Sequence, residues 1–99
     1  MNITVENDVK IIRMGDKGPN LLSVDRAKQI IQELNYDDCK AVIFLGNDKV
    51  FSAGLNLKDL TSATKPDQVA LIFGTLGKLL QACRDFQGPV ISIVGGHAI

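Results

Sequence analysis

The stretch that decides the fold of this chain is Lys49-Val50-Phe51-Ser52-Ala53-Gly54-Leu55-Asn56-Leu57-Lys58-Asp59-Leu60. It follows directly on the apolar run 41–46, which reads Ala-Val-Ile-Phe-Leu-Gly. This order predicts a buried strand, a short loop of small residues and the beginning of a helix. A backbone N–H that points out of such a loop beside a helix N-terminus can stabilise negative charge, which is half of what an oxyanion hole requires.

Strands and helices alternate around this stretch. We expect a strand over 9–14 that pairs with residues 3–5 across the turn 6–8, and then a helix over 24–34 that Ser23 caps. A second helix begins at Pro66 and carries an apolar stripe from 69 to 83, and a last strand covers 90–94. Residues 41–45 are continuously apolar, which is typical of a strand buried on both faces. The order β-β-α-β-α-β predicts an α/β domain with a mainly parallel sheet.

The composition is that of an ordinary globular protein. The chain has 99 residues, of which 45% are hydrophobic and 22% charged, so it forms one domain at most. Its formal net charge is zero, which indicates no nucleic-acid or membrane-surface partner, and its apolar runs are too short to span a bilayer. Cys39 and Cys83 lack disulfide or metal-ligand spacing and are expected to be buried thiols. Without a signal-peptide pattern, the predicted location is the cytoplasm.

Three motifs together resemble the crotonase superfamily, the enoyl-CoA hydratase/isomerase family. They are Asn20-Leu21-Leu22-Ser23, the segment 51–58 (Phe-Ser-Ala-Gly-Leu-Asn-Leu-Lys) and the segment 88–99 (Gly-Pro-Val-Ile-Ser-Ile-Val-Gly-Gly-His-Ala-Ile). The resemblance covers nearly all the chain from Val5 onward, but only the N-terminal part of the usual family length. It implies an incomplete crotonase-like spiral of β-β-α units, with residues 1–99 forming the N-terminal part of a single domain. An apolar tripeptide after the last strand has nothing to dock on, so we expect a fragment or truncated chain.

The resemblance also implies where a substrate would bind. In this family the oxygen of an acyl-CoA thioester lies between two backbone N–H donors, and the motif assigns one of them to the amide of Leu55. The substrate-binding segment is then Ala53, Gly54, Leu55, Asn56, Leu57 and Lys58. Lys58 would reach the CoA phosphates, whereas Asn56 replaces a more common aspartate and can still cap the short helix. The second donor would be a glycine shortly beyond Ile99, and the catalytic carboxylates would follow it.

Read from the residues alone, the same segment is also compatible with an ordinary strand-to-helix turn and with Lys58 as a solvated helix residue. Asp59 and Glu33 are expected to be exposed helix charges, and His97 to make a local packing or solvent contact. No metal site is expected. Gly95-Gly96 lacks the rest of a phosphate-binding fingerprint.

The activity implied by the resemblance is that of an acyl-CoA-binding enzyme of fatty acid metabolism, which hydrates an enoyl-CoA as a lyase or shifts its double bond. Coenzyme A would be part of the substrate, no separate cofactor would be needed, and the assembly would be a homotrimer or hexamer. Two alternatives stay open. The chain could act only in binding or assembly, or the parent could be a thioesterase, decarboxylase or other acyl-CoA hydrolase, or a peptidase, of the same architecture.

Overall fold

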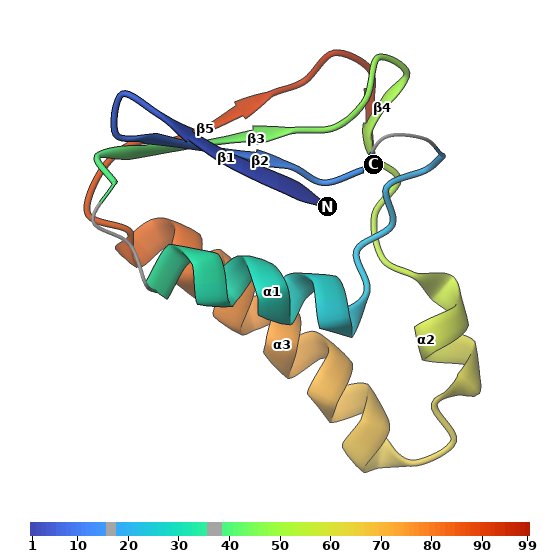
Figure 1. Cartoon of the computed structure of the whole chain (residues 1–99). Coiled ribbons are helices and arrows are strands. Elements are labelled where there is room, and N and C mark those ends of the chain that lie inside the picture. Colours follow the sequence, from blue (N-terminus) through green and yellow to red (C-terminus); the bar gives the residue numbers. More distant parts are fainter. Residues whose placement is uncertain (16–17, 36–38) are drawn as a thin grey trace.

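The computed structural model describes residues 1–15, 18–35 and 39–99 (Figure 1). In chain order its elements are β1 (Asn2–Glu6), β2 (Val9–Arg13), α1 (Val24–Asn35), β3 (Ala41–Leu45), β4 (Val50–Ser52), α2 (Leu57–Ser62), α3 (Pro66–Asp85), β5 (Val90–Ile93) and β6 (His97–Ala98). The strands and helices expected from the sequence are confirmed, but β4 and β6 are additional. The connections between β2 and α1 and between α1 and β3 lie partly outside the described residues.

The main sheet has the strand order β1-β2-β3-β5. β1 and β2 form an antiparallel hairpin, whereas β2 with β3 and β3 with β5 are parallel, so the predicted mainly parallel sheet is confirmed. The hairpin turn places Asn7 at φ 52° and Asp8 at φ 64°. Asn and Asp tolerate this left-handed region better than other side chains, which explains why the turn forms here.

Both long helices lie on the same face of the sheet (Figure 1). The core between these layers includes Ile12, Ile30 and Val42, which are fully buried, together with Phe44 and Leu79. The expectation that β3 is buried on both faces is therefore wrong for the described chain: its residues alternate between buried and half-buried. The physical reason is that no described helix covers the second face.

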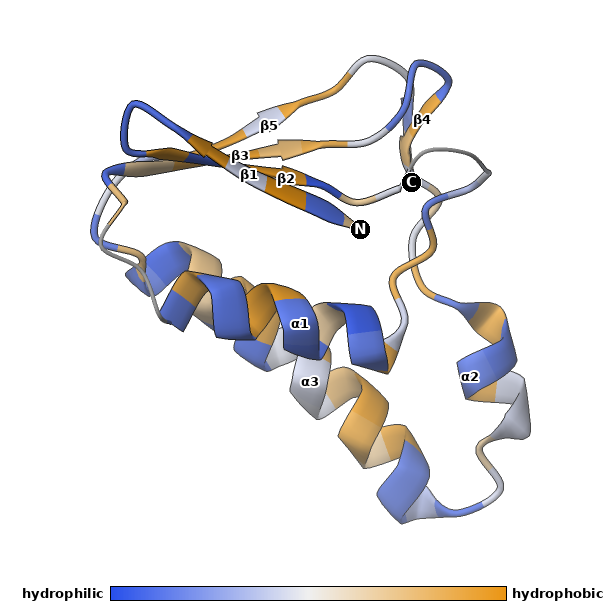
Figure 2. Cartoon of the chain, viewed as in Figure 1, coloured by the Kyte–Doolittle hydropathy of each residue, from blue (hydrophilic) through white to orange (hydrophobic). Residues whose placement is uncertain are grey.

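The second face of the sheet is apolar. Ile11, Ile43 and Ile91 stand side by side in register across β2, β3 and β5, and Ile91 and Ile93 are exposed. Figure 2 shows the hydrophobic colour along β3 and β5. The continuous apolar run of β3 thus supplies one packed face and one open face.

The ends of α1 follow simple capping rules. The Ser23 hydroxyl accepts a hydrogen bond from the Arg26 N–H at 3.1 Å, which confirms the predicted cap. Near the other end, the buried Lys10 ammonium donates to the Glu33 carbonyl oxygen at 3.1 Å and pairs with the Glu33 carboxylate at 2.8 Å. A cation at a helix C-terminus stabilises carbonyls that have no partner inside the helix. Glu33 is expected from the sequence to be an exposed charge, but it instead binds the Lys10 ammonium through its carboxylate and its backbone carbonyl.

The apolar stripe of α3 is wider than its buried side. Ile72 and Leu79 are buried, but Phe73 and Leu80 are exposed, Leu80 by 72%. The predicted apolar stripe is present, but only part of it is packed, because α1 and the sheet contact only one side of this helix. Figure 2 shows apolar residues along much of α3.

A second, two-stranded sheet joins β4 to β6 in parallel. The His97 N–H donates to the Lys49 carbonyl at 3.1 Å, and the Ile99 N–H donates to the Ser52 carbonyl at 2.9 Å. The expectation that the segment after the last core strand has nothing to dock on is therefore wrong. It docks on β4, directly before the loop of small residues.

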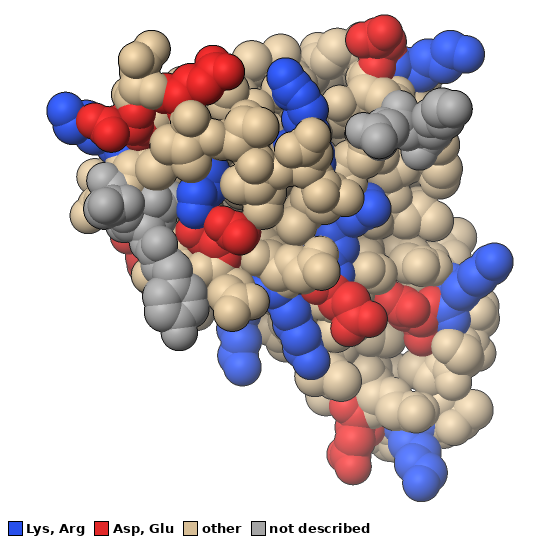
Figure 3. All heavy atoms as spheres, in the orientation of Figure 1, with Lys and Arg blue, Asp and Glu red and all other residues tan. Residues whose placement is uncertain are grey.

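Charge is distributed without a dominant sign. Figure 3 shows Lys and Arg interspersed with Asp and Glu over the face drawn. None of the helices in the described ranges is long and apolar enough to cross a membrane. Neither cysteine forms a disulfide within the described residues; Cys39 is buried and Cys83 half-buried, and burial raises the pKa of the Cys83 thiol. In the same ranges, no group of three His, Cys, Asp or Glu side chains could hold a metal ion.

Candidate active site

The loop 53–56 lies between two other segments of the chain. On one side the Ala53 N–H donates to the Pro19 carbonyl at 2.9 Å, and the Leu22 N–H donates to the Gly54 carbonyl at 2.8 Å. On the other side β4 leads into the loop while paired with β6. The segments 20–23, 51–58 and 88–99, which are far apart in the sequence, therefore converge around this loop.

The Leu55 amide is the candidate donor of this site. Leu55 and Leu22 form an isolated parallel bridge. The Leu22 N–H donates to the Gly54 carbonyl, and the Leu22 carbonyl accepts a hydrogen bond from the Asn56 N–H at 3.2 Å. In a parallel ladder the residue between two such bonds directs its own N–H and C=O away from the partner strand. Within the described ranges, no atom accepts a hydrogen bond from the Leu55 N–H. This amide is thus available to an external oxygen.

Gly54 brings the loop close to the last described residue. Its φ is +94°, a left-handed conformation that favours glycine, and a Cβ at this position would lie 3.0 Å from the Ile99 carbonyl oxygen. The loop and the segment after β6 therefore touch through backbone atoms. A side chain at residue 54 would separate them.

The remaining predicted site residues begin α2. The Asn56 side chain accepts a hydrogen bond from the Lys58 N–H at 3.0 Å, so the predicted cap is confirmed even though an asparagine replaces the aspartate common there. Leu57 and Lys58 occupy the first turn, and both are exposed. Lys58 can therefore meet a ligand that approaches along the surface, but it takes no part in the packing of the loop.

Sequence reasoning missed Asn20 as a structural centre of the site. Asn20 is 5% exposed and has φ 49°, and its amide Nδ2 donates to the carbonyls of Val50 at 3.1 Å and Phe51 at 3.4 Å. Its own carbonyl accepts a hydrogen bond from the Ser52 hydroxyl at 3.0 Å. The available signal was an asparagine directly after Gly-Pro, because asparagine tolerates positive φ.

Two carboxylates that could act as acids or bases, those of Asp59 and Glu33, have other contacts. Asp59 accepts a hydrogen bond at 3.4 Å from the Val24 N–H at the start of α1, so its carboxylate helps to hold α2 against α1. Glu33 pairs with Lys10, as described above. His97 lies in β6 with its side chain exposed, as expected. The described residues thus provide a backbone N–H donor in a loop of defined conformation. We assign no proton-transfer group among them.

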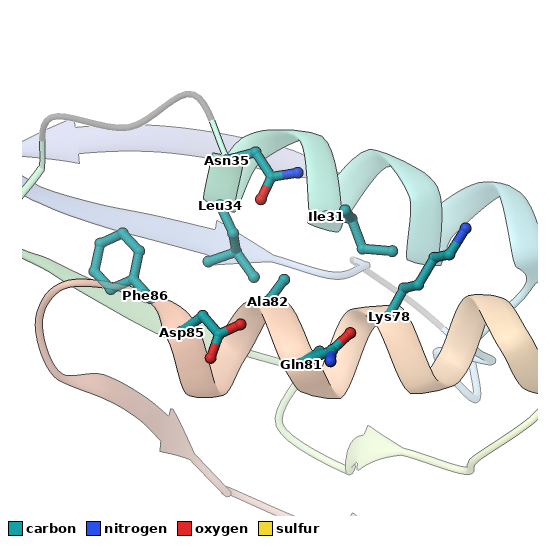
Figure 4. Close-up of a pocket in the computed structure, with 8 residues that line it drawn as sticks. All are labelled: Ile31, Leu34, Asn35, Lys78, Gln81, Ala82, Asp85 and Phe86. Atoms are coloured by element: carbon teal, nitrogen blue, oxygen red, sulfur yellow. The ribbon is translucent and has the colours of Figure 1, made fainter.

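A groove between α1 and α3 is separate from this loop (Figure 4). Lys78 and Asp85 rise from α3 beside Ile31 and Leu34 of α1, and Phe86 closes one end (Figure 4). The lining is that of two packed amphipathic helices with solvated rims. We therefore place the candidate site at the loop.

Comparison with known proteins agrees with the three motifs and with their convergence. A sequence model described as enoyl-CoA hydratase/isomerase matches residues 4–99. The chain belongs to the enoyl-CoA hydratase/isomerase family. The human mitochondrial enoyl-CoA hydratase domain-containing protein 3 is 33% identical over 92 residues, which cover 89% of this chain and 30% of that protein. The mouse protein of the same name is 30% identical over 92 residues, 89% of this chain and 31% of that one.

Solved structures of the enoyl-CoA hydratase/isomerase family have the same fold. The human domain-containing protein 3 superposes with a TM-score of 0.86 at 29% identity, covering 96% of this chain and 40% of that one. An enoyl-CoA hydratase from Polaromonas gives a TM-score of 0.85 at 25% identity, covering 94% and 39%. The predicted crotonase fold is therefore confirmed, and the chain spans less than half the length of these relatives. The roles of residues 53–58 in binding and catalysis stay predictions.

Proposed function

We propose that the complete protein encoded by this gene binds an acyl-CoA thioester and polarises its carbonyl through the Leu55 N–H. The observation that carries this proposal is the Leu55 amide, which lies in a loop held from both sides and has no acceptor among the described residues. A preformed donor needs no reorganisation when negative charge develops on the thioester oxygen. Losing one such donor typically costs about 3 kcal/mol of transition-state stabilisation.

Polarisation of this carbonyl would serve either reaction of the family. In an enoyl thioester it draws electron density from the double bond, so that water adds at the β-carbon and an enolate oxygen develops at the Leu55 N–H. In double-bond migration the same oxygen carries the charge after a proton leaves the α- or γ-carbon. Both routes require a proton-transfer group, which we propose is supplied by residues after Ile99, together with a second N–H donor.

The contact of Ile99 with Gly54 supports this placement of the second donor. The β4–β6 pairing leads the backbone along the loop, so the residues after Ile99 in the complete protein would pass beside the Leu55 amide. We propose that Lys58, which is exposed in the first turn of α2, meets the CoA phosphates as a point charge. We propose no separate cofactor, because coenzyme A enters with the substrate.

The proposal is tested with the complete gene product, a trans-2-enoyl-CoA and free coenzyme A. We expect calorimetric titration to detect the thioester, and loss of the conjugated enoyl absorbance to follow turnover. Replacing Gly54 by valine should abolish thioester binding, because the added side chain meets Ile99 and the backbone is strained. Unchanged binding by the Gly54→Val variant would contradict the assignment of this loop. Binding without turnover of any thioester would favour the binding-only alternative.

Assembly and location are also proposals. We propose a homotrimer or hexamer, as the family resemblance implies, and light scattering of the complete protein would measure it. A cytoplasmic location stays a prediction from the sequence, and imaging of the tagged complete protein would test it.

A further inference from the structure

We infer that Asn20 is a positioning residue of the oxyanion loop: its side chain fixes the direction of the Leu55 N–H without touching the substrate. The inference rests on the proposed function and adds a residue that this function did not include. It is carried by burial, backbone conformation and a continuous set of hydrogen bonds.

Asn20 holds the strand that leads into the loop. Its Nδ2 donates to the carbonyls of Val50 and Phe51, which are successive residues of β4. Asn20 is a buried residue, and its side-chain amide would cost free energy if it lacked partners, so these contacts fix both the side chain and the strand. The side-chain amide of Asn20 therefore links β4 to the segment 19–22 through hydrogen bonds.

The backbone of Asn20 continues this contact into the loop. The Ser52 hydroxyl donates to the Asn20 carbonyl at 3.0 Å and accepts a hydrogen bond from the Gly54 N–H at 3.1 Å. This chain of bonds occupies the Gly54 N–H, the amide directly before that of Leu55. The loop thus presents the amide of Leu55 to a ligand and keeps the preceding amide turned inward.

The positive φ of Asn20 connects its backbone to its side chain. At φ 49° the carbonyl and the side chain reach β4 together, an arrangement that asparagine tolerates better than most residues. Gly15 packs directly on this side chain, because a Cβ at residue 15 would collide with the Asn20 Oδ1. The position of the amide is therefore fixed from two sides.

Two variants change this network in different ways. Asn20→Asp keeps the size and the tolerance of positive φ, but replaces the donor by an oxygen that faces the carbonyls of Val50 and Phe51. Gly15→Ala leaves Asn20 intact and displaces its side chain. Asn7→Asp is the matched control, because Asn7 also has positive φ, 52°, but lies in the exposed hairpin turn between β1 and β2.

The readout is the absorbance of a bound enoyl thioester whose double bond is conjugated to an aromatic ring. Hydrogen bonding to its carbonyl oxygen shifts the absorbance to longer wavelength, and the shift is measured at saturation so that it reports polarisation rather than affinity. Turnover of an enoyl-CoA by the same proteins gives kcat and KM. All measurements use the complete gene product.

We expect Asn20→Asp and Gly15→Ala to bind the thioester with a smaller shift than wild type, and kcat to fall on the order of ten- to a hundredfold while KM stays near wild type. Asn7→Asp should match wild type. If Asn20→Asp does not fold, Gly15→Ala carries the test. A wild-type shift in folded Asn20→Asp or Gly15→Ala overturns the positioning role alone. A wild-type protein that binds no thioester, or binds it without a shift, overturns the proposed function and this inference with it.

Discussion

Adding a single methyl group at Gly54 tests the contact between the loop and the segment after β6. Gly54 has φ +94°, and L-residues in the left-handed region cost about 1–2 kcal/mol. The added Cβ of Gly54→Ala would also lie 3.0 Å from the Ile99 carbonyl oxygen, so the two backbones must separate by a few tenths of an ångström. Such overpacking costs about a further 1 kcal/mol, the lower end of the usual range.

Gly18 provides the control, because it shares the strain without the contact. Its φ is +82°, and a Cβ there would meet no atom of the described residues within 4 Å. Gly18→Ala should therefore destabilise the complete gene product by about 1–2 kcal/mol, and Gly54→Ala by about 2–3 kcal/mol. Each kcal/mol corresponds to a decrease in Tm on the order of 2–4 °C.

Thermal unfolding and thioester titration of the two variants separate strain from site geometry. We expect Gly54→Ala to have the lower Tm and to lose affinity for an enoyl-CoA, whereas Gly18→Ala should keep wild-type affinity. Equal decreases in Tm together with wild-type affinity in both variants would refute the reasoning, because the loop would then not depend on its distance from Ile99.

Four further predictions concern single side chains or amides. Leu55→Pro removes the candidate donor without breaking a described hydrogen bond, so kcat should fall about 10²–10³-fold, whereas Leu55→Met should keep it; equal rates would contradict the donor role. Lys58→Gln should raise KM at low salt by about fivefold or less and leave kcat unchanged, and the difference should vanish at high salt. Lys10→Met should destabilise the fold by about 1–2 kcal/mol in chemical unfolding, because it removes the ion pair of a buried lysine with the partly exposed Glu33, whereas Lys40→Met, whose ion pair is exposed at 3.9 Å, should have almost no effect. Because burial raises the pKa of Cys83, its thiolate population stays low as the pH rises through the ordinary thiol range, and mass spectrometry should find it alkylated more slowly than in the unfolded protein.

The sequence was sufficient for the elements that depend on local patterns. The hairpin β1–β2, the caps at Ser23 and Asn56 and the long helix from Pro66 follow from turn residues, capping residues and periodicity, and all are confirmed. The family resemblance placed the candidate loop. These features need only the chemistry of neighbouring residues.

The features that were missed depend on contacts between distant segments. β4 and β6 have three and two residues, too few for a recognisable strand period, and they form only by pairing with each other. The role of Asn20 arises from carbonyls thirty residues away in β4. Glu33 looked like a surface charge on α1 because nothing in its own helix reveals the buried Lys10 of β2. Long-range pairing of this kind has no signature in a single sequence.

The most direct test of the central claim is a structure of the complete gene product bound to an enoyl-CoA or a non-reactive thioester analogue. The measurement is the distance from the Leu55 amide nitrogen to the thioester oxygen. The account predicts a hydrogen bond of about 2.7–3.1 Å, with the CoA phosphates on the side of Lys58. A thioester carbonyl bound away from the loop 53–56, with the Leu55 N–H still without an acceptor, would contradict it.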